Sequence, residues 1–132
     1  MIEALKDSLT VLVVDDYPDS RTVFRRLMEA RGCAVVEAAD GEQAVEAARR
    51  ARPDMILLDL NMPRLDGLAA AQRIRRLRGA CGGVPIIAIT AFDTYGMKEA
   101  AEEAGCNAYL TKPIDTENLD RTLRDLMPLW FV

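Results

Sequence analysis

Histidine is absent from the 132-residue chain, which excludes acid–base catalysis by an imidazole and most zinc sites. Cys33, Cys81 and Cys106 match no metal-binding or redox spacing, so we expect buried or half-buried thiols. No apolar run is long enough to cross a membrane, and the first residues lack the apolar segment of a signal peptide. The net charge of −4 provides no electrostatic basis for nucleic-acid binding. We therefore expect a cytoplasmic protein with no membrane insertion and no direct nucleic-acid contact.

The residues that are present are typical of one globular domain. Half of them are apolar, 29% are charged, and no segment is low in complexity. We expect a lead-in at 1–8, a domain at 9–127 and an apolar tail at 128–132 that packs beside the last helix. The chain also holds a cluster of four arginines, namely Arg73, Arg75, Arg76 and Arg78. Such a run most often forms a solvated helix face.

Short apolar runs alternate with segments of helical periodicity. The runs, which we predict to be strands, are 10–14, 34–38, 55–58, 84–89 and 108–110. Continuous apolar runs of this length suit strands that are buried on both faces of a parallel sheet. Strand and helix alternate five times, so we predict an α/β fold of the (βα)₅ type, with helices on both faces of the sheet and right-handed crossovers.

Helix boundaries are marked by capping residues. Pro18 suits the first turn of the first helix. The predicted apolar face of that helix comprises Val23, Phe24, Leu27 and Met28. The predicted N-caps of the second, third and fifth helices are Asp40, Asp66 and Asp115. We expect the third helix to run as far as Gly79 and the fourth to cover about 94–104.

Polar residues closely follow four of the predicted strands. They are Asp15 and Asp16, Asp59, Thr90, and Lys112. Because the carboxyl ends of parallel strands share one edge, where ligands bind, these side chains should meet at one site. Two carboxylates about 4 Å apart repel by roughly 4 kcal/mol at an effective dielectric of ~20, and a divalent cation relieves that repulsion. Hard oxygen ligands of this kind favour Mg²⁺, with Mn²⁺ as an alternative.

A carboxylate beside such a cation is a candidate nucleophile. Asp59 could accept a phosphoryl group and become an aspartyl phosphate. Lys112 and Thr90 could each contact a phosphoryl oxygen, and the small Ala91 would leave room for the group to enter.

Two short segments refine this site. Asn61 places a backbone carbonyl and an amide at the edge of the metal position, and Met62-Pro63 then turns the chain away. The Lys112–Pro113 bond lies in a tight turn after a strand, where a cis peptide could aim the lysine inward.

With these motifs the chain resembles the receiver domains of bacterial two-component response regulators over residues 9–127. The motifs are Val13-Val14-Asp15-Asp16, the segment 57–67, Ile89-Thr90-Ala91 and Tyr109-Leu110-Thr111-Lys112-Pro113. The resemblance implies a flavodoxin-like three-layer sandwich with a five-stranded parallel sheet in the order 2-1-3-4-5. It also implies that Asp59 is phosphorylated by a histidine kinase or a histidine phosphotransfer protein.

The same resemblance implies roles for the surrounding residues. The metal ligands would be Asp15, Asp16, Asp59 and the backbone carbonyl of Asn61. Thr90 and Lys112 would contact the phosphoryl group, and the protein would be a signalling module that catalyses its own phosphorylation and dephosphorylation.

Tyr109 stands where the family carries its switch aromatic, three residues before Lys112. When phosphorylation draws Thr90 inward, Tyr109 would move in behind it and remodel the surface of the fourth helix, fifth strand and fifth helix. A downstream protein would dock on that surface, and the receiver would act as a monomer or a phosphorylation-dependent dimer. The alternative for Tyr109 is a half-buried core residue.

Phe92 lies two residues after Thr90, at the mouth of the predicted site. A polar or acidic side chain there could orient an attacking water, whereas phenylalanine cannot. We therefore expect a longer-lived aspartyl phosphate than in relatives that carry a carboxylate at this position.

Other functions are compatible with parts of the pattern. A haloacid-dehalogenase-like phosphatase would carry a second carboxylate where this chain has Asn61. A flavodoxin-like flavin binder would need a Ser/Thr/Gly-rich phosphate loop where this chain has Asp15-Asp16-Tyr17-Pro18-Asp19. A receiver that acts without phosphorylation is a further alternative, and the sequence does not separate a stand-alone receiver from one cut out of a longer regulator.

Overall fold

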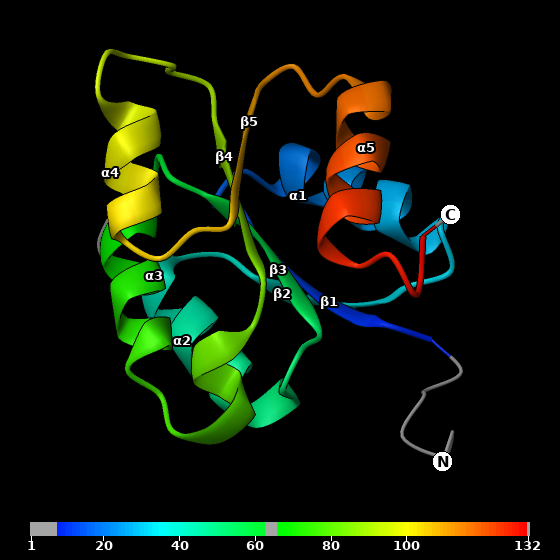
Figure 1. Ribbon diagram of the computed structural model, residues 1–132, viewed down its shortest axis with the longest axis horizontal. Helices are drawn as coiled ribbons and strands as arrows, with labels where there is room; N and C mark the ends of the chain where they lie inside the picture. Colours follow the sequence, from blue (N-terminus) through cyan, green and yellow to red (C-terminus); the bar gives the residue numbers. More distant parts are fainter. Residues whose placement is uncertain (1–7, 63–65, 132) are drawn as a thin grey trace.

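The computed structural model describes residues 8–62 and 66–131 (Figure 1). The predicted turn at Pro63, most of the predicted lead-in and the last residue of the tail lie outside these ranges.

A five-stranded parallel sheet forms the centre of the fold. Its strands are β1 (Thr10–Val14), β2 (Ala34–Ala38), β3 (Met55–Asp59), β4 (Ile86–Thr90) and β5 (Ala108–Thr111). The spatial order β2-β1-β3-β4-β5 confirms the predicted fold class and strand order. Every residue of β3 and β4 is buried, as expected for continuous apolar runs inside a parallel sheet, whereas the edge strand β2 is mostly exposed or half-buried.

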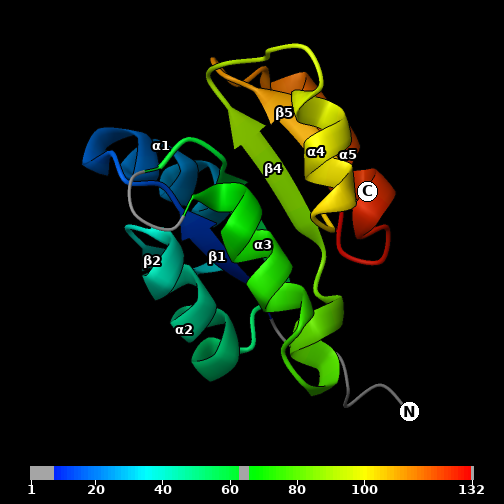
Figure 2. The same cartoon turned by 90° about the vertical axis from the view of Figure 1, so that its left-hand side faces the viewer.

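Helices cover both faces of this sheet. They are α1 (Pro18–Glu29), α2 (Gly41–Ala51), α3 (Gly67–Arg75), α4 (Met97–Glu103) and α5 (Thr116–Leu126), with a short 3₁₀ helix, η1 (Gly79–Gly83). Helices α1 and α5 lie on one face, and α2, α3 and α4 on the other (Figures 1 and 2). None of the helices in the described ranges is both long and apolar enough to span a membrane.

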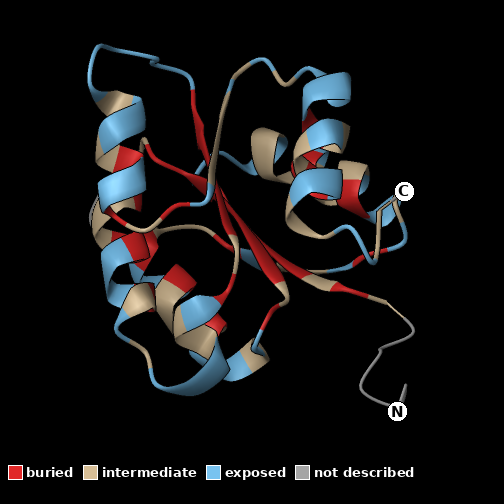
Figure 3. Cartoon of the chain, viewed as in Figure 1, coloured by how far each residue is buried: buried red, intermediate tan, exposed pale blue. Residues whose placement is uncertain are grey.

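The apolar core is divided by the sheet into two clusters. Alternate residues of each strand point to opposite faces, so Leu12 and Leu58 pack with α2, α3 and α4, while Val13 and Leu57 pack with α1 and α5. The buried residues accordingly follow the strands and the inner faces of the helices (Figure 3). This packing holds the strand ends in fixed register, on which the site depends.

The predicted N-caps are all in place. Asp40, Asp66 and Asp115 each accept a hydrogen bond from a backbone N–H in the first turn of their helices. The reciprocal bond at α2 differs from a standard capping box, because Gln43 Oε1 accepts from the N–H of Ala39 at 2.8 Å rather than from the cap residue.

Some predicted boundaries and buried faces were wrong. Helix α3 ends at Arg75, before the predicted end at Gly79, and the Arg75 side chain donates to backbone carbonyls of other segments. Helix α4 begins only at Met97, after Gly96 adopts a φ of 84°, which is incompatible with a continuing helix. Val23, predicted to face the core, is 55% exposed, whereas Phe24 and Met28 are buried as predicted.

The described part of the apolar tail follows α5. Trp130 and Phe131 are half-buried and pack against the core cluster on the α1 and α5 side. Leu129 is 87% exposed and takes no part in this packing.

Candidate functional site

The predicted polar residues converge at the carboxyl end of the sheet. Val14 is paired with Leu58, and Asp59 with Ile89, so the residues that follow β1, β3 and β4 lie at nearly the same level. Carboxylate oxygens of Asp15, Asp16 and Asp59 lie within 4.8 Å of one another. We call these three residues the acidic cluster; Asp15 and Asp59 are buried and Asp16 is exposed.

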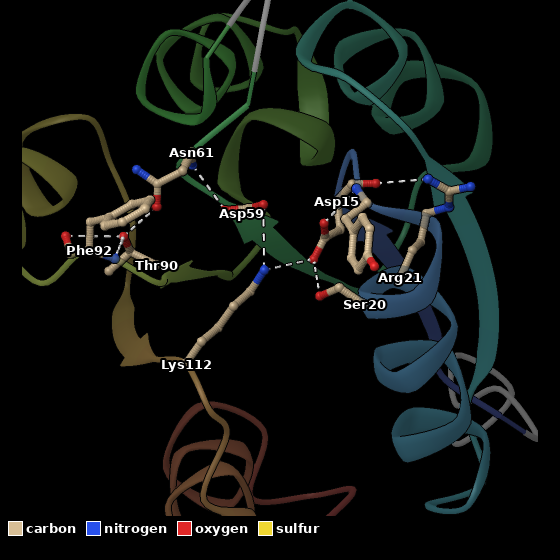
Figure 4. Close-up of polar contacts among 9 residues, drawn as sticks. Asp15, Ser20, Arg21, Asp59, Asn61, Thr90, Phe92 and Lys112 are labelled. Atoms are coloured by element: carbon tan, nitrogen blue, oxygen red, sulfur yellow. Dashed lines mark hydrogen bonds and ion pairs between the residues drawn. The ribbon is translucent and has the colours of Figure 1, made fainter.

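Asp15 is held rigidly. Its carboxylate accepts the Ser20 hydroxyl at 2.5 Å, the Tyr17 backbone N–H at 2.9 Å and the Lys112 ammonium at 3.0 Å (Figure 4). Its backbone carbonyl accepts from Arg21 at 2.9 Å. Sequence reasoning missed Ser20 and Arg21, although their place in the first turn of the helix after Asp15 was a usable signal.

Asp59 is the buried centre of the site. The residue is 4% exposed, and its carboxylate accepts the Asn61 backbone N–H at 2.9 Å. Burial raises the pKa of this carboxyl to about 6, against the lowering effects of the Asn61 hydrogen bond and of Lys112; Asp15 and Asp16 raise it further. The hydrogen bond from Asn61 and the charge of Lys112 therefore do not fully offset the cost of burying the Asp59 carboxylate in its charged form.

Lys112 connects the two buried carboxylates. Its ammonium nitrogen lies 3.0 Å from Asp15 Oδ2 and 3.6 Å from Asp59 Oδ2. The peptide bond to Pro113 is cis. The stem of the lysine also brings the ammonium to 6.0 Å from the centre of the Phe24 ring.

Thr90 and Asn61 are hydrogen-bonded to each other on the side of Asp59 that faces away from Asp15 (Figure 4). The Thr90 side chain is fully buried, and its hydroxyl lies 2.5 Å from Asn61 Oδ1 and 3.0 Å from the Phe92 backbone nitrogen, from which it accepts (Figure 4). Phe92 itself is 62% exposed, and Ala91 is exposed beside it. The Asn61 side chain therefore accepts a hydrogen bond from Thr90. That the Asn61 backbone carbonyl binds a metal ion stays a prediction.

Tyr109 is half-buried on β5 and points to the loop after β4. Its hydroxyl donates to Asp93 at 2.7 Å. Burial and the bond to Asp93 raise the pKa of the phenol to about 12. The ring packs against the core cluster on the α2, α3 and α4 side, together with Met97 of α4. Sequence reasoning did not identify Asp93 as the partner of this tyrosine.

The arrangement of strands, carboxylates and lysine can be compared with known proteins. Residues 11–124 match the response regulator receiver domain family. The chain belongs to this family. It is a receiver domain of two-component signalling systems and thus a signalling module, which decides against the phosphatase and the flavin binder.

Curated relatives are response regulators. The receiver domain is 33% identical to the polar-differentiation response regulator DivK of Brucella anthropi, over 89% of this chain and 95% of DivK. It is 39% identical to the response regulator MprA of Mycobacterium tuberculosis, over 91% of this chain. The chain spans only 51% of the length of MprA.

Solved structures of similar fold include one with a bound metal. The receiver domain of a sensor histidine kinase from Pseudomonas aeruginosa aligns with a TM-score of 0.81 and 39% identity, covering 94% of this chain and 98% of that one. That structure holds a magnesium ion coordinated in its active-site cleft. The chemotaxis protein CheY4 of Vibrio cholerae aligns with a TM-score of 0.83 and 30% identity, covering 91% and 99%.

The donor set of this receiver domain fits the same metal. Three carboxylates within 4.8 Å provide hard oxygen ligands, and because burial raises the pKa of Asp59, a bound cation would stabilise its charged form. Mg²⁺ prefers such sites, with water completing its coordination. Nothing in the site favours Mn²⁺ in particular.

Proposed function

We propose that Asp59 accepts a phosphoryl group from a histidine kinase or a histidine phosphotransfer protein in an Mg²⁺-dependent reaction. The observation that supports this most strongly is the buried Asp59 carboxylate, which lies close to the other two acids of the cluster and 3.6 Å from the Lys112 ammonium. Phosphoryl transfer depends mainly on positioning and on neutralising the phosphoryl oxygens, and this site offers both.

The proposed transfer exchanges a P–N bond of the donor for a P–O bond to Asp59. An Asp59 carboxylate oxygen attacks the phosphorus of the donor phosphohistidine, a P–O bond forms, and the P–N bond breaks with its electron pair returning to the imidazole. The Asn61 N–H bond to Oδ1 orients the carboxylate for this attack. Asp15, Asp16, Asp59 and the Asn61 carbonyl are the proposed ligands of Mg²⁺, which when bound neutralises charge on the phosphoryl oxygens.

Lys112 and Thr90 contact the phosphoryl group once it is in place. The Lys112 ammonium already lies 3.6 Å from Asp59 and needs only to exchange a carboxylate oxygen for a phosphoryl oxygen. The Thr90 hydroxyl leaves Asn61 and donates to another phosphoryl oxygen. By the same contacts the chain assists its own phosphorylation and the later hydrolysis of the aspartyl phosphate.

The switch to the surface runs through Thr90 and Tyr109. In the structure, the Tyr109 hydroxyl donates to Asp93, which lies in the loop after β4, three residues after Thr90. Movement of Thr90 displaces this loop, releases Tyr109 and repacks the surface of α4, β5 and α5, where a downstream protein docks. The receiver acts as a monomer or a phosphorylation-dependent dimer in the cytoplasm, with residues 9–127 as the functional unit.

Beryllofluoride binding tests this proposal because the compound mimics an aspartyl phosphate. We expect a bound ¹⁹F signal only when Mg²⁺ is present, and none in Asp59→Asn. Asp125→Asn, which changes an exposed acid on α5, is the matched control and should bind normally. Equal binding in Asp59→Asn, or no Mg²⁺-dependent binding in wild type, would favour a receiver that acts without phosphorylation.

A further inference from the structure

A second candidate site lies at the opposite end of the sheet from Asp59. A cavity of about 490 Å³ opens between the end of α2 and the segment that follows α3. Four arginines line it, namely Arg49, Arg52, Arg76 and Arg78. Arg52 precedes the start of β3 by three residues, whereas Asp59 ends that strand. We call this space the arginine cavity; it shares no residue with the acidic cluster.

The charges around the arginine cavity are largely uncompensated. Arg49 pairs with Glu46, which also binds Arg50 outside the cavity. Across residues 8–62 and 66–131, no ion pair joins Arg52, Arg76 or Arg78 to an acid. Three arginines that line one concavity therefore have no ion-pair partner among the described residues, although the chain as a whole carries a net charge of −4. Like charges repel, so this clustering has an electrostatic cost that a bound anion would offset.

Arg76 and Arg78 belong to the run of four arginines noted in the sequence. The other two members of that run, Arg73 and Arg75, do not line the cavity and instead bond to other segments of the chain. Arg73 pairs with Glu42 of α2 at 3.1 Å. Arg75 donates to the carbonyls of Gly105 and Val84 at 2.7 Å and 2.6 Å, and to that of Gly82 at 3.1 Å. These bonds tie down η1, whose first residues form a wall of the cavity. The wall is thus held in place before any ligand arrives.

We propose that the arginine cavity binds a small anion that carries two or more phosphate groups, of about the size of a nucleotide. Guanidinium groups match phosphate oxygens in geometry as well as in charge. The volume falls within the range of about 300–1,000 Å³ that is typical of small-molecule sites. Because the arginines line a concave space rather than a flat patch, a compact ligand fits better than the surface of an acidic protein. Leu77 and Cys81 offer an apolar wall for a base or another flat group.

Titration calorimetry on the full chain in Mg²⁺-free buffer tests the proposal with tripolyphosphate, ADP and adenosine as probes. We expect the first two to bind and adenosine not to bind, since it has no phosphate. Tighter binding of ADP than of tripolyphosphate would identify a nucleotide-type ligand, and equal binding a ligand recognised through its phosphates alone. Asp59→Asn should bind as wild type does, because the two sites share no residue.

Matched variants locate the binding. Arg76→Ala and Arg78→Ala should each weaken it by about tenfold, the loss expected for one good charged contact. Arg50 lies on α2 but does not line the cavity, so Arg50→Ala removes the same charge from outside the site. The affinity of this variant for the probes should therefore stay within about twofold of wild type. All three side chains are exposed, so the variants should fold. No binding at millimolar probe, or an equal loss in Arg50→Ala, would overturn the proposal.

Discussion

At the scale of single residues, the site depends on how two buried carboxylates are compensated. Asp15 and Asp59 are 1% and 4% exposed, and the Lys112 ammonium forms ion pairs with both. A buried carboxylate without a partner is costly, so in the absence of metal this lysine stabilises the fold as well as the site. A bound divalent cation would share that task, which links metal binding to stability.

Replacing the lysine tests this link. Lys112→Met keeps a long side chain but removes the charge, and we expect it to destabilise the metal-free protein by roughly 1–3 kcal/mol. This is below the ~3–5 kcal/mol of a fully buried pair, because Lys112 is 24% exposed. Urea unfolding with and without saturating Mg²⁺ measures the effect, and Mg²⁺ should recover part of the loss. Lys98→Met, an exposed lysine on α4, is the control; an equal loss with and without Mg²⁺ would contradict the account.

Phe92 is the exposed residue for which the sequence predicts an effect on the lifetime of the aspartyl phosphate. Its ring is exposed at the mouth of the site and cannot orient a water molecule, so Phe92→Glu should shorten the lifetime of the aspartyl phosphate. Release of inorganic phosphate from the phosphorylated protein measures this lifetime. Tyr95→Glu places the same charge on an exposed aromatic position in the same loop and should leave it unchanged. Equal decay rates for wild type and Phe92→Glu would count against the hypothesis.

Individual residues differed in how far the sequence predicted them. Asp15, Asp59 and Thr90 could be placed together because each directly follows an apolar run, and parallel strands end at one edge. Ser20 was missed although its place in the first helix turn after Asp15 was a usable signal, and Asp93 could not be placed because its contact depends on the direction of a side chain from a loop. The partners of Asp15 and Tyr109 therefore became visible only in the structure.

At the scale of elements, a bidentate ion pair joins the end of α1 to α5 on the face of the sheet that both helices cover. Arg31, just after α1, donates from Nε and Nη2 to the two oxygens of Asp120 on α5, at 2.6 Å and 3.2 Å. The Arg31 hydrogen bond lowers the pKa of the Asp120 carboxyl below its usual value. The pair therefore stabilises the contact between the two helices whenever Asp120 is ionised.

The pH dependence of this contact has a definite sign. Since the folded-state pKa is lowered, the contribution of Asp120 is present above its unfolded pKa of about 3.9 and is lost as the pH falls through the folded-state pKa. Asp120→Asn should cost less than about 1 kcal/mol at pH 7, as is usual for partly exposed pairs. The difference from wild type should vanish in strong acid. Unfolding free energies across pH measure this, with Asp125→Asn as control; a constant difference at all pH values would contradict it.

Three helix starts were predictable from the sequence, whereas the start of α4 and the end of α3 were not. Asp40, Asp66 and Asp115 marked three starts, because an N-cap is a local signal formed within four residues. The end of α3 at Arg75 was not predicted, and the side chain of this last helical residue donates to the carbonyls of Val84 and Gly105 in other segments. Contacts of this kind form only in the folded chain and leave no local pattern in the sequence.

At the scale of the whole molecule, the sheet separates two chemically opposite ends. The acidic cluster lies at the carboxyl ends of β1 and β3, and the arginine cavity at the end of the sheet where β3 begins. The architecture was predictable from the sequence, because five apolar runs alternating with helices allow few other folds. The arginine cavity was not predictable, because its members come from α2 and from the segment after α3, which only the tertiary fold brings together.

The central claim is that Asp59 takes up a phosphoryl group with the help of a metal ion. Phosphoramidate, a small donor with the same P–N bond as phosphohistidine, tests it without knowledge of the partner kinase. Intact mass spectrometry of the full chain should show the addition of one phosphoryl group in the presence of Mg²⁺. It should show none with a chelator and none in Asp59→Asn. An unmodified wild-type chain with Mg²⁺ present, or equal modification of Asp59→Asn, would contradict the account.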